Sequence, residues 1–455
     1  MAGIGFELRK ILSKDSYTST MRAYLYAGLI SSGPWVLSII SVMLIGVLSL
    51  GAVLPETLIG QFLVTVTYLM ATSLILTGGL QLFFTRFVSD RLFERRLDLI
   101  LPNLVGILLL VTIVSGLLAI CVLGLLFDQS FSYRLLVMAN FVVLCNLWLV
   151  IIFLSGMKAY NRILGVMFLG YSLMVASAYL LRFLNIDGLL LGLLIGHSSL
   201  LFIFLFDILR EYPAERLVAF DFLKRRQVFG SLLLTGLCYN LGIWIDKFIF
   251  WFNPSTSEAV IGPLRASILY DLPIFLAYLS IIPGMAVFLV RIETDFVEYY
   301  NKFYDAVRGG GSLEFIESMR DEMVYSIQQG LSEIGKIQTL AILTTFVAGP
   351  ALLDALGISQ LYLPLLHVQV IGAGLQVALM AVLNVFFYLD QRRIVLFLCL
   401  EFLLLNVLFT AGTLWFGAAL YGYGFTLAAL LTLASGLMLL SRQLNRLEYE
   451  TFMLQ

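Results

Sequence analysis

The stretch from Pro102 to Phe127, PNLVGILLLVTIVSGLLAICVLGLLF, contains 26 residues and no charged side chain. A helix of this length crosses about 30 Å of hydrocarbon with residues to spare. A run this long without a charge is typical of a transmembrane helix, because a helix on the surface of a soluble protein needs a polar face. The stretch therefore predicts a membrane protein, and the rest of the chain is expected to show further spans of the same kind.

The composition of the whole chain agrees with a membrane location. Of its 455 residues, 60% are hydrophobic and only 13% are charged, about half the charged share of a soluble domain. Such a chain cannot cover itself with the charged surface that a soluble enzyme needs, and it is too apolar to be disordered. The formal net charge of −1 gives no support to nucleic-acid binding.

Apolar stretches long enough to span the membrane recur along the sequence. They predict an all-α polytopic membrane protein with twelve transmembrane helices. The predicted spans cover residues 23–50, 59–85, 102–127, 135–157, 163–181, 187–208, 228–252, 266–290, 337–356, 363–388, 394–417 and 424–441.

Basic residues are distributed unevenly between the predicted connections. With the N-terminus inside, 24 of the 28 lysines and arginines lie on the cytoplasmic side. The outside holds only Arg134, Arg182 and Arg265, and Lys247 lies within a span. Because cytoplasmic loops of membrane proteins are enriched in lysine and arginine, both termini are predicted to be cytoplasmic.

The long inner connection 209–227 divides the spans into two groups of six. This predicts an N-terminal lobe over 23–208 and a C-terminal lobe over 228–441, followed by a cytoplasmic tail over 442–455; transporters are often built from such halves. Residues 1–22 place Ile4, Leu8 and Ile11 at helical spacing. They are predicted to form an amphipathic helix on the inner membrane surface, with a merely polar leader as the alternative.

A second inner segment, 291–336, is predicted to be an amphipathic insertion within the C-terminal lobe. It carries five basic and nine acidic residues. Gly309-Gly310-Gly311 interrupts the helical rhythm, and Ser312 is suited to cap a second helix. An acidic amphipathic pair suits a protein partner better than anionic lipid, although it could also be a linker that packs on its own bundle.

Motifs of enzymatic chemistry are missing from the sequence. It contains no GxxxxGK[ST] phosphate loop, no GxSxG elbow and no HExxH zinc motif. The four cysteines lack paired spacing; they are Cys121, Cys145, Cys238 and Cys399. The two histidines, His197 and His367, are interpreted as hydrogen-bonded packing residues. We therefore expect no enzyme activity, no cofactor and no metal site.

Charged residues within predicted spans are functional candidates, because burying a charge in lipid is costly. Asn240, Trp244 and Lys247 fall at i, i+4 and i+7 and share one face, while Asp246 is about 100° away from Lys247 and is expected to face elsewhere. Asp271, six residues after Arg265, comes at a similar depth, so that a Lys247–Asp271 contact is predicted. These residues form either the charged wall of a central cavity or, in part, a structural ion pair.

Glu401 is a second candidate, in the apolar run 395–407. It is either an ion- or proton-coupling acid or a carboxylate hydrogen-bonded to a neighbour. Asn384, on the preceding span, is predicted to lie at a similar depth.

Several strings of the sequence are similar to one known family. They are MAGIGFELRK at 1–10, YAGLISSGPW at 26–35, the stretch 240–247, and the segment from Arg265 through Asp271 and Pro283-Gly284 to Arg291. Along the whole chain the sequence resembles the Pel exopolysaccharide exporters (PelG), of the multidrug/oligosaccharidyl-lipid/polysaccharide (MOP) flippase superfamily.

The resemblance implies two six-helix lobes around a V-shaped cavity in the bacterial inner membrane. It also implies an acetylgalactosamine-rich polysaccharide as cargo, and a complex with a cytosolic glycosyltransferase and cyclic-di-GMP-responsive membrane subunits. The expected function is polysaccharide translocation, with Asn240, Trp244, Asp246, Lys247, Arg265 and Asp271 along the path. The alternative is a secondary antiporter or lipid-linked oligosaccharide flippase of the same superfamily, with Glu401 as coupling acid.

Overall fold

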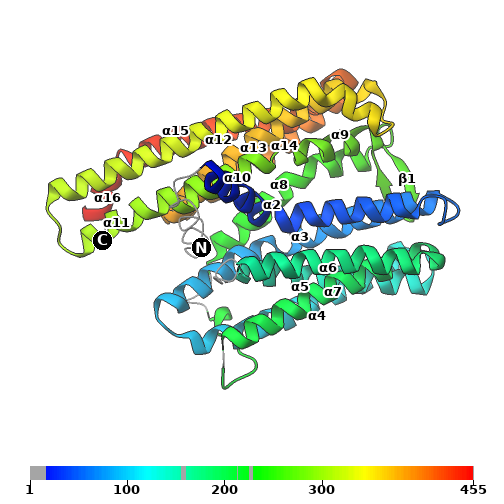
Figure 1. Ribbon diagram of the computed structural model, residues 1–455, viewed down its shortest axis with the longest axis horizontal. Helices are drawn as coiled ribbons and strands as arrows, with labels where there is room; N and C mark the ends of the chain where they lie inside the picture. Colours follow the sequence, from blue (N-terminus) through cyan, green and yellow to red (C-terminus); the bar gives the residue numbers. More distant parts are fainter. Residues whose placement is uncertain (1–16, 155–159, 213, 225–228, 454–455) are drawn as a thin grey trace. The chain divides into compact units, whose positions relative to one another are not determined.

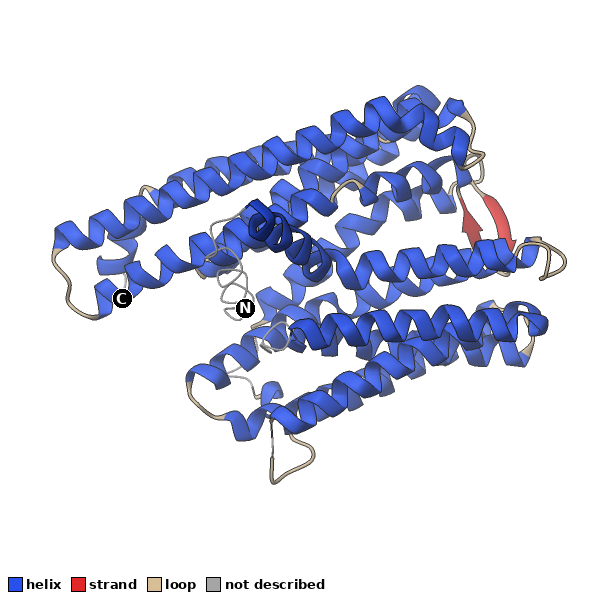
Figure 2. Cartoon of the chain, in the orientation of Figure 1, coloured by secondary structure: helices blue, strands red, loops and turns tan. Residues whose placement is uncertain are grey.

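The computed structural model describes residues 17–154, 160–212, 214–224 and 229–453. Within these ranges the chain is helical apart from short connections and one two-stranded hairpin (Figure 2). The interfacial helix predicted for residues 1–22 lies mostly outside the described residues.

The helices follow one another in the order of the predicted spans (Figure 1). The first seven long helices are α2 (Tyr17–Ser49), α3 (Thr57–Phe93), α4 (Ile100–Leu126), α5 (Phe131–Leu154), α6 (Tyr160–Leu181), α7 (Asn185–Glu211) and α8 (Gly230–Phe252). After the strands β1 (Glu258–Ile261) and β2 (Leu264–Ala266) come α9 (Ile268–Leu279), α10 (Ile282–Val290), a π-helical turn η5 (Arg291–Phe296), α11 (Val297–Arg308), α12 (Leu313–Ala355), α13 (Leu363–Tyr388), α14 (Arg392–Phe416), α15 (Tyr423–Leu444) and α16 (Leu447–Met453). Short 3₁₀ turns lie at η1 (Leu97–Leu99), η2 (Arg182–Leu184), η3 (Asp221–Leu223), η6 (Gln360–Tyr362) and η7 (Ala418–Leu420).

The predicted all-helical, multi-pass membrane fold is confirmed. The described residues contain ten helical stretches that are long and apolar enough to cross a membrane. One of these stretches, 162–211, contains α7 and all but the first two residues of α6, and Leu37–Ser49 within α2 is a further, shorter apolar helix. The count of twelve spans and the cytoplasmic side of the termini stay predictions.

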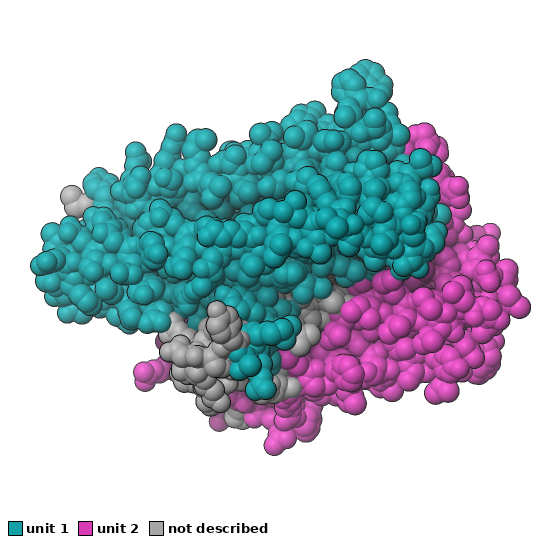
Figure 3. Space-filling view, turned by 45° about the horizontal axis from the view of Figure 1, so that its top comes forward, with its two compact units in different colours: residues 1–32, 245–249, 268–455 teal, residues 33–244, 250–267 magenta. Residues whose placement is uncertain are grey.

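The chain forms two compact units, coloured separately in Figure 3. Unit 2 comprises residues 33–244 and 250–267, and unit 1 comprises residues 1–32, 245–249 and 268–455. Unit 2 holds α3 to α7 with most of α8 and the β1–β2 hairpin. Unit 1 holds α9 to α16 and one turn of α8.

Unit 2 contains a tight hairpin between α6 and α7. Gly188, Gly192 and Gly196 line one face of α7 at intervals of four residues. A Cβ atom at Gly192 would lie 2.4 Å from the Cα of Ala178, which is closer than side-chain packing allows. Small residues at such a crossing let two membrane helices approach backbone to backbone.

The connection between α7 and α8 is docked onto the N-terminal end of α4 in unit 2. Asn103 accepts hydrogen bonds from the backbone N–H of Asp221 at 2.7 Å and of Phe222 at 3.3 Å, and its own amide donates to Asp221 Oδ2 at 3.2 Å. Phe222 is buried among phenylalanines of α3. Hydrogen bonds from Lys224 and from Asn103 lower the pKa of the Asp221 carboxyl below its usual 3.8.

Unit 1 is organised around α13, which packs against α9, α12 and α15. Its longest helix is α12, with 43 residues and a length of about 64 Å. Because the hydrocarbon core measures only about 30 Å, roughly half of α12 extends beyond it, alongside α11 (Figure 1). Ser312 caps α12 by accepting a hydrogen bond from the N–H of Phe315, as the sequence predicts.

Candidate functional site

An ion pair between consecutive residues of α8 lies inside unit 1. Lys247 Nζ lies 3.1 Å from each carboxylate oxygen of Asp246. The Asp246 side chain is fully buried, and Lys247 is only 3% exposed. The Tyr270 hydroxyl donates a further hydrogen bond to Asp246 Oδ2 at 2.7 Å. The pair is therefore compensated both by opposite charge and by a hydrogen bond, which a buried ion pair requires.

This pairing corrects the prediction that Asp246 faces away from Lys247. The Cα–Cβ directions of neighbouring residues differ by about 100° on a helix, but a lysine ends its side chain on a flexible four-carbon stem. The ammonium of Lys247 bends back to the adjacent carboxylate. The burial of the pair fits a structural role within unit 1, and a place for these two residues along a substrate path stays a prediction.

Aromatic side chains surround the ammonium group of Lys247. Its Nζ atom lies 5.2 Å from the ring centroid of Tyr278 and 5.1 Å from that of Phe425. A desolvated cation over an aromatic face gains about 2 kcal/mol. On α13, Gln369 donates to the carbonyl of Tyr270 at 3.4 Å. Helices α9, α13 and α15 therefore hold this turn of α8 in place.

Asn240, one of the predicted path residues, lies in unit 2 where α8 crosses α3. Its amide donates to the carbonyl of Gly236 at 2.9 Å. A Cβ atom on Gly78 of α3 would come within 2.2 Å of the same amide nitrogen. The side chain is part-exposed, so that it both fills the crossing and keeps access to solvent.

Trp244 and Arg265 belong to a connected row of side chains in unit 2. The Trp244 ring lies 6.4 Å from that of Trp251, which stacks on Tyr68 at 4.5 Å. The Tyr68 hydroxyl donates to the carbonyl of Arg265 at 2.9 Å. The guanidinium of Arg265 donates to the hydroxyl and the carbonyl of Ser257 at 2.9 and 2.7 Å, which closes the β1–β2 hairpin.

Asp271 lies in the first turn of α9 and is part-exposed. A carboxylate at this position is favoured by the helix dipole. Lys247 is paired with Asp246, and Asp271 lies near enough to add to the attraction on the same ammonium. A direct contact between Lys247 and Asp271 stays a prediction.

Glu293 is a candidate that the sequence reasoning missed. It lies in the π-helical turn η5 and is 3% exposed. The Tyr388 hydroxyl donates to Oε2 at 2.7 Å, and the Asn384 amide donates to Oε1 at 3.1 Å. The available signal was its place between the buried residues Ile292 and Phe296, directly after an apolar run.

Arg291 fastens the same turn to α12. Its guanidinium makes a two-pronged ion pair with Glu333, at 2.5 and 2.9 Å, and a second pair with Asp295 at 2.6 Å. Such fork-to-fork pairing fixes geometry as well as charge. The turn that carries Glu293 is therefore held by α12 on one side and by α13 on the other.

Glu401 accepts a hydrogen bond from the Ser435 hydroxyl at 2.7 Å. This agrees with the interpretation of Glu401 as a carboxylate hydrogen-bonded to a neighbour. Its other oxygen, Oε2, is buried and has no hydrogen-bond partner among the described residues. Asn384, predicted at a similar depth, donates to Glu293.

Both histidines pack against aromatic rings as expected, but both ring nitrogens of His197 and Nε2 of His367 lack the expected hydrogen bond among the described residues. His197 is 1% exposed and meets Tyr171 edge to face at 6.2 Å. Neither of its ring nitrogens has a hydrogen-bond partner in the described part of the chain. His367 packs on Phe346 at 4.3 Å between ring centroids.

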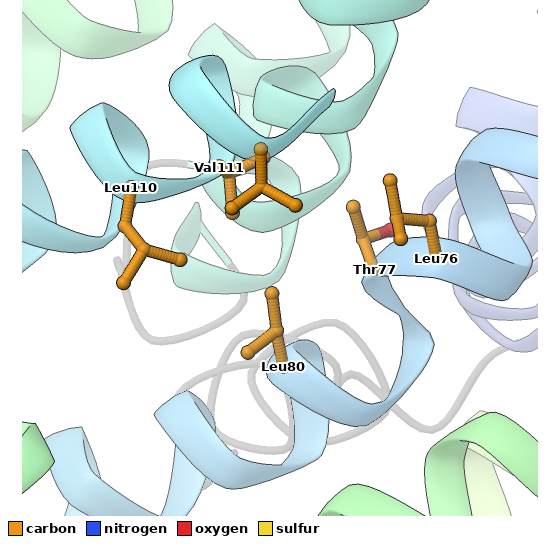
Figure 4. Close-up of a pocket in the computed structure, with 6 residues that line it drawn as sticks. Leu76, Thr77, Leu80, Leu110 and Val111 are labelled. Carbon is orange, nitrogen blue, oxygen red and sulfur yellow. The ribbon is translucent and has the colours of Figure 1, made fainter. Parts of the chain in front are cut away.

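A small pocket between α3 and α4 is apolar (Figure 4). Its lining residues are Leu76, Thr77, Leu80, Leu110, Val111 and Val114. The one hydroxyl, on Thr77, donates to the carbonyl of Ser73 at 2.8 Å. Such a lining has little to offer a sugar. The described ranges also contain no group of three or more His, Cys, Asp or Glu that could hold a metal ion.

Comparison with known proteins covers nearly the whole chain. Residues 1–452 match the family model PelG, described as an exopolysaccharide exporter (EPS-E). No curated protein sequence matches the chain.

Among solved structures, the chain is similar to MATE transporters and other members of the MOP superfamily. A mutant of the MATE transporter VcmN from Vibrio cholerae superimposes with a TM-score of 0.62 at 16% identity, covering 97% of this chain and 98% of that one. An outward-facing multidrug-resistance MATE transporter gives 0.66 at 15% identity, with 93% and 96% covered. A MOP superfamily transporter from Pyrococcus furiosus gives 0.65 at 13% identity, with 93% and 96% covered. At these identities the likeness establishes the fold alone.

Proposed function

Since the chain belongs to the PelG family of exopolysaccharide exporters, we propose that it moves a Pel-like, acetylgalactosamine-rich polysaccharide across the bacterial inner membrane. The family match over residues 1–452 carries this proposal. The MOP transporter fold supports it, because other proteins with this fold carry solutes across membranes. The proposal extends the family's export function to one polymer and to one membrane.

The residues assigned to the polysaccharide path differ in the parts they play. Asn240 and Trp244 are part-exposed on one face of α8. They supply an amide and an aromatic ring, which can hydrogen-bond and stack on a sugar. The buried pair of Asp246 and Lys247 keeps the same helix in position. Arg265, in β2, and Asp271, in the first turn of α9, are part-exposed charges on either side of the short connection between the hairpin and α9.

The segment 291–336 supplies the surface on which a cytosolic glycosyltransferase docks. The protruding half of α12 exposes Leu313, Phe315 and Tyr325, with exposed fractions of 63%, 50% and 62%. Exposed acidic residues, among them Glu314 and Glu317, accompany them. An apolar and acidic mixture of this kind suits a protein surface with complementary charge. Cyclic-di-GMP-responsive membrane subunits complete the complex.

Transport in this proposal uses no nucleotide and no cofactor of its own. Polymer extension by the partner enzyme supplies the driving force, because the chain contains no phosphate-binding loop. The alternative is a secondary antiporter or a lipid-linked oligosaccharide flippase. The Oε2 atom of Glu401 has no hydrogen-bond partner in the described ranges, which favours that alternative, since a coupling acid must be able to bind an ion.

Secretion of polymer by living cells tests the proposal. In a strain that makes the polymer, deletion of this chain should leave polymer inside the cell and none outside. The deletion strain is then supplied with variants of the chain. Trp244→Ala should insert into the membrane without restoring secretion, whereas the control Trp415→Ala, at a position 93% exposed, should insert and restore secretion. Normal secretion by the deletion strain refutes the proposal. If secretion stops when the proton gradient is collapsed while synthesis continues, the antiporter alternative is supported.

A further inference from the structure

The pocket between α3 and α4 has no polar group to offer a ligand. Its one hydroxyl, on Thr77, donates to the Ser73 carbonyl at 2.8 Å and accepts from the Gln81 amide at 2.9 Å. The other lining side chains are aliphatic (Figure 4). Water is a poor occupant of such a pocket, because an ordered water needs two or more polar partners. The occupant that fits the lining is therefore an apolar chain.

The pocket lies at the depth of lipid tails. Thr77 comes eight residues before the end of the predicted span 59–85, and Val111 comes nine residues after the start of the predicted span 102–127. At 1.5 Å per residue, both lie about 12–14 Å from the membrane surface on the side of the α3–α4 connection. One leaflet supplies half of the hydrocarbon core, about 15 Å. The tail of a lipid in that leaflet therefore reaches the pocket.

The rim of the pocket is open to the surface of α4. Val114, one of the lining residues, is 46% exposed. Other exposed side chains of this helix, Leu109, Ile113 and Leu117, are aliphatic as well. Exposed aliphatic groups in the middle of a span suit contact with hydrocarbon rather than with water. A lipid tail can therefore enter the pocket from the side.

The connection between the same two helices combines exposed apolar and basic side chains. Phe93 is 83% exposed, and Leu97 is exposed beside it. Arg95 and Arg96 are exposed too. Arg96 pairs with Asp98, whereas Arg95 forms no ion pair within the described ranges. Apolar side chains next to arginines suit a membrane surface with anionic headgroups, and a guanidinium is well shaped to bind a phosphate.

The pocket and the basic connection lie on one pair of helices, the first at the depth of tails and the second at the level of headgroups. From this geometry we propose that α3 and α4 bind one anionic phospholipid, with an acyl chain in the pocket and its phosphate at Arg95 and Arg96. The charge favours this lipid over a zwitterionic one, and the pocket favours it over a free phosphate. The bound lipid fills a gap in unit 2. This site is independent of whether the cargo is a polysaccharide.

Native mass spectrometry of the purified full-length protein, washed free of lipid in detergent, tests the proposal. Three lipids are added in turn. They are long-chain phosphatidylglycerol, phosphatidylcholine with the same tails, and dihexanoyl phosphatidylglycerol, whose tails are too short to reach the pocket. We expect long-chain phosphatidylglycerol to bind about tenfold more tightly than either of the others. Equal binding of the long-chain and dihexanoyl forms overturns the proposal.

A bulky side chain at the rim tests the pocket itself. Val114→Trp fills the rim from a position that is already exposed, so the fold is expected to be kept. It should lower the affinity for long-chain phosphatidylglycerol about tenfold. The control Leu117→Trp changes an exposed residue of the same helix that does not line the pocket and should leave the affinity unchanged. Equal affinities of the two variants contradict a tail in the pocket.

Removing the arginines tests the headgroup contact. Arg95→Gln with Arg96→Gln should abolish the preference for phosphatidylglycerol over phosphatidylcholine. The control Arg442→Gln with Arg446→Gln changes two exposed arginines near the C-terminal end of α15 and should keep the preference. If both double variants keep it, the phosphate is not bound at the α3–α4 connection and the proposal fails.

Discussion

Lys247 and Asp246 are neighbours in the sequence, and the lysine ammonium lies 3.1 Å from both oxygens of the aspartate. The two charges thus neutralise each other within one turn of α8, inside unit 1. Tyr270 completes the carboxylate's hydrogen bonding, and Tyr278 and Phe425 cover the ammonium. Because both side chains are buried, these neighbours take the place of water around the two charges.

Removing the lysine alone should be strongly destabilising. Lys247→Met leaves Asp246 buried and unpaired, which should lower the free energy of unfolding by about 3–5 kcal/mol. Changing both residues, Asp246→Asn with Lys247→Met, should restore part of the loss. Thermal unfolding in detergent measures both effects. The control Lys302→Met breaks an exposed pair with Glu298 and should cost under about 1 kcal/mol; equal losses for Lys247→Met and Lys302→Met would contradict the account.

The crossing of α3 and α8 should not tolerate a methyl group at Gly78. Its Cβ would lie 2.2 Å from the Asn240 amide nitrogen and 2.9 Å from the Gly236 carbonyl oxygen. We expect Gly78→Ala to destabilise the protein by about 1–3 kcal/mol, as overpacking does. Gly60→Ala, on the same helix with nothing within 4 Å, should be neutral or stabilising. Thermal stability and the yield of folded protein compare the two variants, and similar values would disprove this packing.

Much of the fold could be predicted from the sequence, because a helix that crosses lipid requires a long uncharged run. Long uncharged runs predicted the helices, and Ser312 after the triple glycine predicted the start of α12. The β1–β2 hairpin was not predicted. It depends on contacts between segments far apart in sequence, such as the hydrogen bond from Gln61 to the Val260 carbonyl.

The contacts of the candidate site were harder to predict from the sequence, for two physical reasons. Helical geometry fixes where a side chain starts but not where a long one ends, so that Lys247 meets Asp246 against expectation. The π-helical turn at 291–296 changes the helical phase, so that regular periodicity could not show Glu293 facing Asn384 and Tyr388.

The docked connection between α7 and α8 should loosen when Asn103 is removed. Asn103→Ala deletes the acceptor of two backbone N–H groups, those of Asp221 and Phe222. Their hydrogen–deuterium exchange should accelerate about tenfold for every 1.4 kcal/mol lost. Exchange in α5, far along the chain, should stay unchanged. If the two amides keep their protection, this docking does not depend on Asn103.

The same connection should respond to acid only at low pH. The pKa of Asp221 is lowered in the folded state, first by its hydrogen bond with Lys224 and then by that with Asn103. A lowered pKa gives stability that is present above the unfolded value of 3.8 and lost as the pH falls through the folded one. Amide protection at 221–222 should therefore be constant near neutrality and weaken below pH 3.8. Asp221→Asn should remove this dependence, and weakening already near neutrality would contradict it.

The orientation predicted from basic residues can be tested by cysteine labelling in intact cells. Ser255→Cys, in the turn before β1, should react with a membrane-impermeant maleimide. Ser318→Cys, on the protruding half of α12, should react only after the cells are opened. Both positions are exposed, so that accessibility reports the side of the membrane. The opposite labelling pattern would reverse the predicted topology.

Export itself is tested most directly in inverted inner-membrane vesicles that contain the polymer-making enzyme. The vesicles are supplied with radiolabelled sugar nucleotide and then treated with a glycosidase that cannot enter them. If the chain is a polysaccharide exporter, labelled polymer should be protected inside the vesicles only when the chain is present. Equal protection in vesicles that lack it would contradict the central claim.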